Sequence, residues 1–298
     1  MAHSIISERY DAAGRPMYEY LCDTAEDLQE IKTCSAGSTA YVVSEKKYYM
    51  RNCCDEWREK PTSGGGSGGG GDGSEDNGDV KYLEAQYAEV NLTKATAVKP
   101  YAFYKDTVIN TIKMPKVASI GGNAFWNCTK LISAEMPNAS TIEVCAFQKC
   151  SKLESILLSS GLSEIKNYTF QDCQNLKLTS LPSAVKKIGM YAFDACKNIT
   201  LTIMPSELFT VDNNAFVGCT GLPYLNFGTK INYIGSNAFQ NCTGLESVTI
   251  NNKPSTLSSS AFSGCTNLTR INVSWAEGEV AGAPWGATNA TINYNFKG

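Results

Sequence analysis

Cysteines are the residues of this chain with the most chemistry to offer, and seven of them recur at nearly constant spacing. The 298 residues include 12 cysteines and a single histidine, His3. Thiolates bind zinc, and thiols in an oxidising compartment form disulfides. Which chemistry applies depends on the elements that carry the recurring set, which is Cys128, Cys150, Cys173, Cys196, Cys219, Cys242 and Cys265.

A metal centre is the first alternative, and the spacing of the cysteines disfavours it. The chain contains no C-x-x-C pair, and Cys22, Cys34, Cys53 and Cys54 fit no standard zinc pattern. A histidine base or a histidine-ligated metal lacks its residue, because His3 lies at the polar start of the chain. We therefore expect no metal, no cofactor and no catalytic residue.

The recurring cysteines mark one position of a sequence repeat whose length varies by a single residue along the chain. A phenylalanine precedes each cysteine by three residues, and an aliphatic residue follows it by three. A coil of this kind cannot bury its apolar side alone, so stacked coils form one continuous core. The pattern predicts a mainly β, helix-poor solenoid of about nine coils with a parallel β-sheet, on the order of 40 Å long. The phenylalanines are Phe103, Phe125, Phe147, Phe170, Phe193, Phe216, Phe239 and Phe262.

The solenoid decides between the two interpretations of the cysteines. Neighbouring coils place successive Cα atoms about 4.8 Å apart, which is within disulfide reach. Side chains in register point parallel to one another, however, and that geometry disfavours a bridge. We interpret the set as a ladder of buried thiols that pack as small hydrophobic groups. Asp106 takes the cysteine position in the first full coil, as expected of an atypical terminal repeat.

The chain divides into three parts. Residues 1–60 form a small module in which Thr39–Val43 and Lys47–Arg51 read as a β-hairpin. Residues 61–80 are a Gly/Ser/Asp-rich flexible linker. Residues 81–298 are the solenoid, and Trp275 and Trp285 are large enough to cap its last coil.

The repeats carry a family resemblance. Segments such as IGSNAFQNCTGLESVTI and VDNNAFVGCTGLPYLNF resemble the BspA-type leucine-rich repeat family over about residues 83–274. The resemblance implies a curved superhelix of leucine-rich repeats that is used for binding, and it implies no catalytic residues.

Two further segments resemble parts of bacteriophage proteins. AGSTAYVVSEKKYYMRNCCDEW is similar to short N-terminal segments of virion proteins, although Cys53-Cys54 replaces the polar pair usual there. WAEGEVAGAPWGATNATINYN is similar to the ends of leucine-rich-repeat proteins encoded by phages of gut Firmicutes. These resemblances imply a virion protein whose residues 1–60 dock on other virion proteins and whose solenoid is displayed outward.

Net charge and hydropathy limit which classes of partner the chain can bind. A net charge of −3 excludes a strongly basic nucleic-acid binder, which needs an excess of Lys and Arg. The longest apolar stretches are too short to insert into a membrane, and Met1–Pro16 has no run of signal-peptide type. We expect a protein that folds in the bacterial host cytoplasm and is then part of the virion.

Outward positions of the predicted strands supply the candidate binding residues. A stripe of apolar side chains is expected to be exposed, and such a patch often marks a binding site. An equal alternative is that an oligomer neighbour or the curled edge of the solenoid covers it. The candidates are Leu157, Leu178, Leu201, Ile203 and Tyr224, with Asn226 and Arg270 beside them.

Three functions are compatible with these features. The leading hypothesis is a non-enzymatic head fibre, decoration protein or tail fibre that binds a protein or glycan on a host-cell or mucosal surface. Fibres of this class are often homotrimers, although no heptad run supports one here. The alternative is a bacterial BspA-like surface adhesin. A glycan-degrading tail enzyme would need two facing carboxylates, and Glu143, Glu154, Glu164 and Glu246 mark out no such pair.

Overall fold

The computed structural model describes residues 89–297 in full and, upstream of them, only the backbone of six strands. Within the described residues every element is a β-strand, and none is an α-helix. No helix in this part of the chain is therefore long and apolar enough to cross a bilayer. The expectation of a helix-poor solenoid with parallel strands is confirmed.

Five upstream strands form one sheet in the order β1-β2-β3-β4-β5. β3 and β4 pair antiparallel, which is the hairpin expected from the sequence. The sixth, β6 (Asp79–Val80), pairs with the solenoid strand β8, so these two residues belong with the solenoid rather than with the predicted linker. The rest of that linker lies outside the described residues. The five strands are β1 (His3–Tyr10), β2 (Pro16–Cys22), β3 (Thr39–Val42), β4 (Lys47–Arg51) and β5 (Trp57–Glu59).

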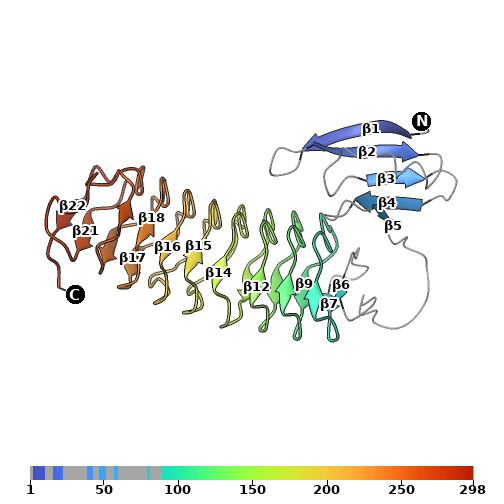
Figure 1. The fold of residues 1–298 in the computed structure, drawn as a ribbon, viewed down its shortest axis with the longest axis horizontal. Helices are drawn as coiled ribbons and strands as arrows, with labels where there is room; N and C mark the ends of the chain where they lie inside the picture. Colours follow the sequence, from blue (N-terminus) through green and yellow to red (C-terminus); the bar gives the residue numbers. More distant parts are fainter. Residues whose placement is uncertain are drawn as a thin grey trace.

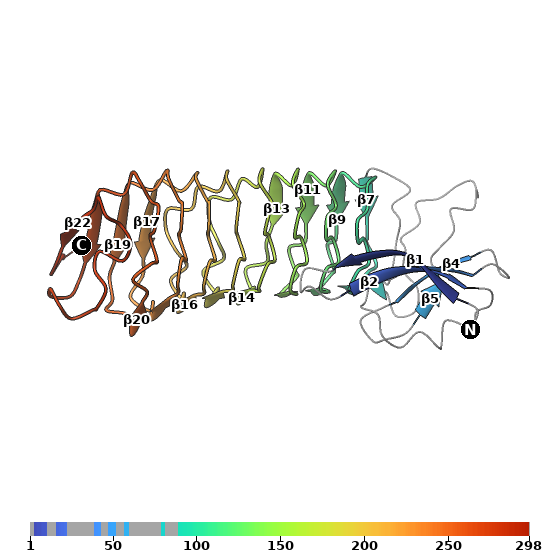
Figure 2. The ribbon, with the colours of Figure 1, turned by 90° about the horizontal axis from the view of Figure 1, so that it is seen from above.

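Each coil of the solenoid contributes strands to two sides, and Figures 1 and 2 show the coils stacked in one row. Strands of three or four residues make up the long-strand side: β7 (Glu89–Asn91), β9 (Thr111–Lys113), β11 (Ser133–Glu135), β13 (Ser155–Leu157), β17 (Tyr224–Phe227), β19 (Ser247–Ile250), β21 (Arg270–Val273) and β22 (Thr291–Asn293). Strands of two residues make up the short-strand side: β6, β8 (Ala97–Val98), β10 (Ser119–Ile120), β12 (Thr141–Ile142), β14 (Glu164–Ile165), β15 (Lys187–Ile188), β16 (Thr210–Val211), β18 (Tyr233–Ile234) and β20 (Thr256–Leu257).

Both sides are interrupted after the third full coil. The short-strand side breaks between β12 and β14, where the step from Ile142 to Ile165 is one residue longer than the step from Ile120 to Ile142. The long-strand side stops at β13 and resumes at β17, and Figure 2 shows the plain backbone between them. One added residue per coil therefore divides the solenoid into a shorter-coil part and a longer-coil part.

Two side-chain ladders run through the core. The phenylalanine rings stack from coil to coil, with centroids 4.9–5.7 Å apart from Phe103 to Phe262. Each ladder cysteine donates its S–H to the carbonyl oxygen of the phenylalanine one coil earlier, as from Cys196 Sγ to Phe170 O at 3.0 Å. The seven Sγ–O distances lie between 2.9 and 3.1 Å. All seven cysteines are buried and unbridged.

The turn around each phenylalanine requires two left-handed residues in most coils. They lie two residues before and two residues after the ring, as Tyr191 (φ 54°) and Ala195 (φ 60°) do around Phe193. Gly218 and Gly264 occupy the second position in their own coils, where glycine has no steric penalty for a positive φ. Other coils use Asn, Lys or Asp at this position.

The C-terminal coil ends the phenylalanine ladder with a tryptophan. Trp285 lies one repeat after Phe262, is fully buried, and accepts a hydrogen bond from the Phe262 N–H through its carbonyl oxygen. The Trp285 ring meets Trp275 edge-on with centroids 6.1 Å apart. Both tryptophans therefore cap the core, as the sequence predicts, and Trp285 does so at the phenylalanine position of the repeat.

The left-handed position makes one substitution stabilising. Ala195→Gly should raise the free energy of unfolding by about 0.5–1 kcal/mol, because glycine removes the cost of a left-handed alanine. Ala192→Gly is the matched control: Ala192 is buried and lies outside the left-handed region, so the same change should lower that free energy by about 1–2 kcal/mol. Chemical denaturation measures both, and equal signs for the two variants would contradict the assignment.

The thiol ladder should make the fold sensitive to alkali. Burial raises the pKa of six ladder thiols above the usual value: Cys128, Cys150, Cys173, Cys196, Cys219 and Cys242. In the unfolded chain a thiol releases its proton near pH 9, whereas the folded chain holds it. The contribution to stability is therefore complete below about pH 9 and is lost as pH rises, by up to about 1.4 kcal/mol per pH unit for each thiol.

Denaturation curves between pH 7 and pH 10.5 test this expectation. Cys196→Ala should show a shallower loss of stability with pH than the parent chain, because one titrating thiol is gone. Iodoacetamide at pH 8 should label the ladder thiols only after denaturation. Parallel pH curves, or rapid labelling of the native protein, would show that the thiols are not held in a buried, protonated ladder.

Candidate binding face

The side chains of β17, β19, β21 and β22 that point away from the core form a regular grid on the long-strand side, in which Asn272 is covered by its neighbours and is 8% exposed. Parallel pairing aligns Tyr224 with Ser247, and then with Arg270 and Thr291, in one row along the solenoid. The second row aligns Asn226, Thr249, Asn272 and Asn293. Successive strands in a sheet lie about 4.8 Å apart, so the two rows repeat at that spacing. We call these eight residues the amide face.

The structure places only part of the predicted apolar stripe on the surface. Leu157, Ile203 and Tyr224 are exposed, with 51%, 70% and 51% of their surface accessible. Leu178 and Leu201 are buried, at 8% and 0%, so the expectation that these two face outward is wrong. The predicted stripe is thus reduced to Leu157, two coils away, and to Ile203 and Tyr224, which lie on neighbouring coils because Ile203 pairs with Asn226.

The reason for this error is the spacing of apolar residues in two coils. Ordinary long strands place apolar residues two apart, as Leu225 and Phe227 do in β17, and both point inward. In the interrupted coils the buried pairs are three apart, Leu178 with Leu181 and Leu201 with Met204. A spacing of three does not match the two-residue period of a strand. These coils therefore form no long strand, and their first leucine turns into the core.

The inward turn of these leucines uncovers one side of Tyr224. Ile203 forms an isolated parallel bridge with Asn226, which aligns Leu201 with Tyr224 in the row. Because Leu201 is buried, no outward side chain occupies the row position next to Tyr224 on that side. Ser247 on the other side is small and bears only a hydroxyl. The Tyr224 ring consequently stands at the edge of the grid as an accessible aromatic surface.

Side-chain amides of the second row are hydrogen-bonded from coil to coil. Asn293 Nδ2 donates to Asn272 Oδ1 at 2.8 Å, and Asn272 Nδ2 donates to Thr249 Oγ1 at 3.2 Å. Asn251, directly after β19, donates through Nδ2 to Asn226 Oδ1 and to the carbonyl oxygen of Phe227, both at 2.8 Å. These bonds fix the rotamers of the row, while an amide has two donors and two acceptor lone pairs and keeps hydrogen-bonding capacity beyond them.

The amide face differs in charge from the long strands before the break. Among its eight residues Arg270 alone is charged. In the earlier part the outward positions include Lys113 and Glu135, which form an ion pair of 3.5 Å between β9 and β11. The amide face therefore has a single charged side chain, whereas the earlier face carries charges of both signs that pair with each other.

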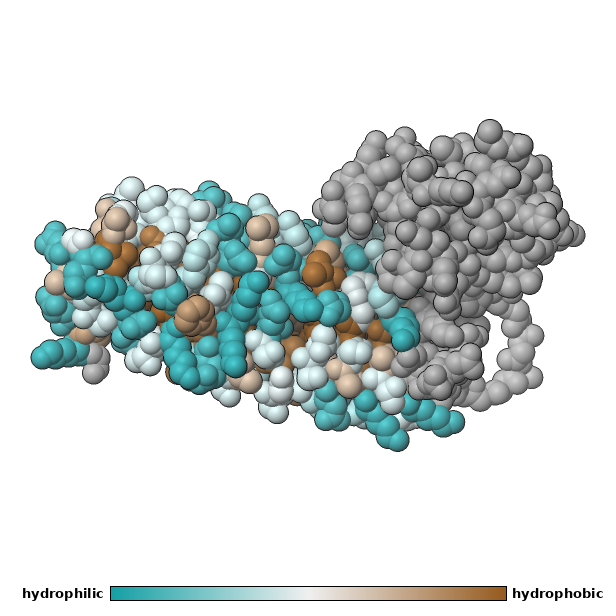
Figure 3. Space-filling model, viewed as in Figure 1, coloured by the Kyte–Doolittle hydropathy of each residue, from teal (hydrophilic) through white to brown (hydrophobic). Residues whose placement is uncertain are grey.

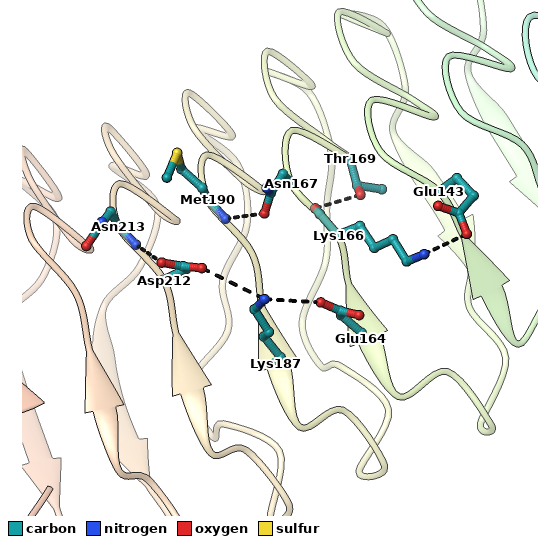
Figure 4. A network of polar contacts seen from close by, with 9 residues as sticks. All are labelled: Glu143, Glu164, Lys166, Asn167, Thr169, Lys187, Met190, Asp212 and Asn213. Carbon is teal, nitrogen blue, oxygen red and sulfur yellow. Dashed lines mark hydrogen bonds and ion pairs between the residues drawn. The ribbon is translucent and has the colours of Figure 1, made fainter. Parts of the chain in front are cut away.

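Charges on the short-strand side are paired between coils, as Figure 4 shows. Lys166 Nζ lies 2.6 Å from Glu143 Oε1, and Lys187 Nζ lies between Glu164 Oε1 at 3.5 Å and Asp212 Oδ2 at 4.0 Å. Half-exposed pairs of this kind contribute little stability each. The charged groups of the short-strand side are thus solvated and already paired with one another. The amide face is therefore the better candidate for recognition.

Exposed large apolar side chains do not gather into a second candidate. Leu157 and Ile203 share one position of the repeat but lie two coils apart, and in the view of Figure 3 hydrophobic residues form separate patches in a hydrophilic surface. Within residues that the structure describes, no group of three His, Cys, Asp or Glu is arranged to hold a metal ion. The exposed set is Val108, Ile132, Val144, Leu157, Ile203, Phe209, Tyr224 and Phe296.

Sequence reasoning identified part of this face and missed the rest. Tyr224, Asn226 and Arg270 were among the candidates, and all three are exposed. Asn251 and Asn293 were missed, since an exposed polar residue in one strand carries no signal alone. Recurrence of Asn or Thr at the same register position in successive coils could have found Asn293, whereas Asn251 follows β19 and lies outside that row.

Stacked parallel coils with a regular outward grid define a repeat scaffold of the leucine-rich-repeat class, a type of fold that typically binds other molecules rather than catalysing reactions. The family model described as BspA type leucine rich repeat region matches residues 84–200 and 186–277. The chain belongs to this family. No curated protein matches the chain.

Solved structures of three leucine-rich-repeat proteins are similar to this chain at low identity. A protein from T. pallidum is 22% identical, with 65% of this chain and 76% of that chain covered and a TM-score of 0.39. A protein from Bacteroides ovatus is 20% identical, with coverage of 61% and 69% and a TM-score of 0.35. A leucine rich cell surface protein from Faecalibacterium prausnitzii is 18% identical, with coverage of 84% and 93% and a TM-score of 0.30.

The inward turn in the interrupted coils is testable with two neighbouring residues. Leu201→Ala should lower the free energy of unfolding by about 2–5 kcal/mol, because it leaves a cavity in the core. Ile203→Ala removes an exposed side chain and should change that free energy by no more than about 0.5 kcal/mol. Urea denaturation of both variants measures the difference. A larger loss for Ile203→Ala would mean that the two side chains are oriented the other way.

Proposed function

We propose that this chain is a non-enzymatic adhesion protein whose solenoid binds a ligand on a host-cell or mucosal surface through the amide face. The observation that carries the proposal is the fixed grid of outward polar side chains beside an uncovered Tyr224 ring. Its rotamers are held by hydrogen bonds between coils, so binding costs little side-chain entropy. Membership of the BspA-type repeat family agrees with a binding scaffold.

The protein acts, in this proposal, as a head fibre, decoration protein or tail fibre of a bacteriophage. Residues 1–60 dock on other virion proteins, and the solenoid points away from the particle. Support comes from the segments AGSTAYVVSEKKYYMRNCCDEW and WAEGEVAGAPWGATNATINYN, which resemble parts of virion proteins. The separate strand sheet of the N-terminal part is compatible with an independent docking module.

A bacterial surface adhesin is the second candidate. The family match favours it, because that match covers the repeats and includes nothing specific to virions. Both candidates use the solenoid for adhesion, and they differ in the particle that carries it.

Fractionation distinguishes the two carriers. Particles from an induced culture are purified on a density gradient, and the particle and cell-envelope fractions are analysed by mass spectrometry. The virion proposal expects this chain in the particle fraction at a stoichiometry comparable to other minor structural proteins. Recovery with the cell envelope, and absence from particles, would contradict the virion proposal and support the adhesin.

A deletion provides the matched control for docking. A chain lacking residues 1–60 should be absent from purified particles, while the same chain in the cytosol keeps the β-rich circular dichroism spectrum of the solenoid. Incorporation of the shortened chain at the parental level would show that residues 1–60 are not the docking module.

A further inference from the structure

We infer that the ligand of the amide face is a neutral glycan, with Tyr224 as the stacking platform and Asn226, Ser247 and Thr249 as hydrogen-bonding partners. The inference rests on the proposed binding function of this face and adds the chemical class of the ligand. It comes from matching the side chains of the grid to the functional groups that each class of ligand would present.

Hydroxyl groups of a sugar are the natural complement of this grid. A sugar hydroxyl both donates and accepts a hydrogen bond, as do the amide of Asn226 and the hydroxyls of Ser247 and Thr249. Asn226 is exposed, and its orientation is fixed by the bond from Asn251 Nδ2. Neighbouring groups repeat at the strand spacing of about 4.8 Å, so several hydroxyls of one chain can be bound in succession.

Tyr224 supplies the apolar contact that a sugar ring requires. One face of a pyranose ring carries mainly C–H groups, which pack against an aromatic surface. Tyr224 lies two residues from Asn226 on the same face of β17, and the side toward Leu201 is uncovered because Leu201 is buried. Stacking and hydrogen bonding are thus available to the same ring.

Other classes of ligand fit the face less well. Polyanions such as nucleic acids need many cations, and Arg270 is the single charged residue of the eight. An extended peptide that adds to a sheet needs free backbone groups, whereas the backbone of β17, β19 and β21 is used in pairing between coils. A folded protein partner is usually anchored by a cluster of large side chains in well-packed pockets, whereas Tyr224 and the neighbouring Ile203 are the two large exposed apolar side chains at this end of the face.

Binding of the full chain to a glycan microarray with neutral, sulfated and sialylated members is the direct test. Neutral glycans should be bound, and the signal should change little between about 0.05 and 0.5 M salt, since screening acts on charges. Tyr224→Ala should weaken binding at least about tenfold, and Asn226→Ala should weaken it several-fold. Absence of any bound neutral glycan, or binding restricted to sulfated or sialylated members, would overturn the inference.

Two exposed residues away from the face serve as matched controls. Phe209 is 52% exposed, as Tyr224 is 51%, but it directly precedes β16 on the short-strand side. Asn138 is an exposed loop amide whose Nδ2 donates to the carbonyl oxygen of Pro115. Phe209→Ala and Asn138→Ala should leave glycan binding unchanged. A loss in these variants equal to that in Tyr224→Ala and Asn226→Ala would contradict the location.

Treatment of the target cells separates this inference from the function on which it rests. Periodate cleaves vicinal diols of glycans, and protease removes surface proteins. Adhesion of the full chain to host cells that is lost after periodate supports the glycan inference. Adhesion that survives periodate but is lost after protease overturns the inference and leaves the adhesion function standing. No adhesion to untreated host cells would overturn both.

Discussion

In seven coils of the solenoid a buried thiol donates to the phenylalanine carbonyl of the preceding coil. The bond spans one coil, from Cys150 to Phe125 and from Cys173 to Phe147. Each of these carbonyl oxygens also accepts the backbone N–H of the residue three positions later, as Phe147 O does from Cys150 N at 3.2 Å. The thiol therefore fills space in the core and adds a second donor, from the next coil, to a carbonyl that already has one. This bond also explains why Asp106 can begin the series, since its carboxylate accepts from the N–H groups of Val108 and Ile109 at 2.8 Å instead.

The core is regular along the solenoid, so the differences between parts of its surface come from small departures from the repeat. Two departures matter: one extra residue per coil after the third full coil, and an apolar spacing of three in the next two coils. The first breaks the short-strand side between β12 and β14. The second removes two long strands and turns Leu178 and Leu201 inward. Together they isolate the amide face from the charged strands before it and leave Tyr224 at its margin.

The regular positions of the repeat could be predicted from the sequence, whereas the departures from it could not. The repeat of Phe and Cys, the parallel stacking and the buried thiols are set by residues that recur, so their spacing was sufficient to predict them. The capping tryptophans do not recur, and they were predicted from their size and their place after the last coil. The orientation of Leu178 and Leu201 was mispredicted because a rule learned from the regular coils was applied to irregular ones. In those coils the leucine is buried in the core although the two-residue period of a strand would point it outward, and no long strand forms. The two hydrogen-bonded sets, Asn251 with Asn226 and Asn293 with Asn272 and Thr249, depend on side-chain rotamers, which periodicity does not determine.

The chain contains coils of two lengths that differ by one residue. This difference limits which coils can recombine without disturbing the stack. Recombination between two of the longer coils would delete or duplicate a complete unit and preserve every stacked ring and thiol bond around it, shifting the reach of the protein by one strand spacing. Recombination between a shorter and a longer coil would create another junction of unequal lengths. The position of the present junction between β12 and β14 therefore divides the gene into two blocks, and lengthening is tolerated more readily within a block than across the boundary.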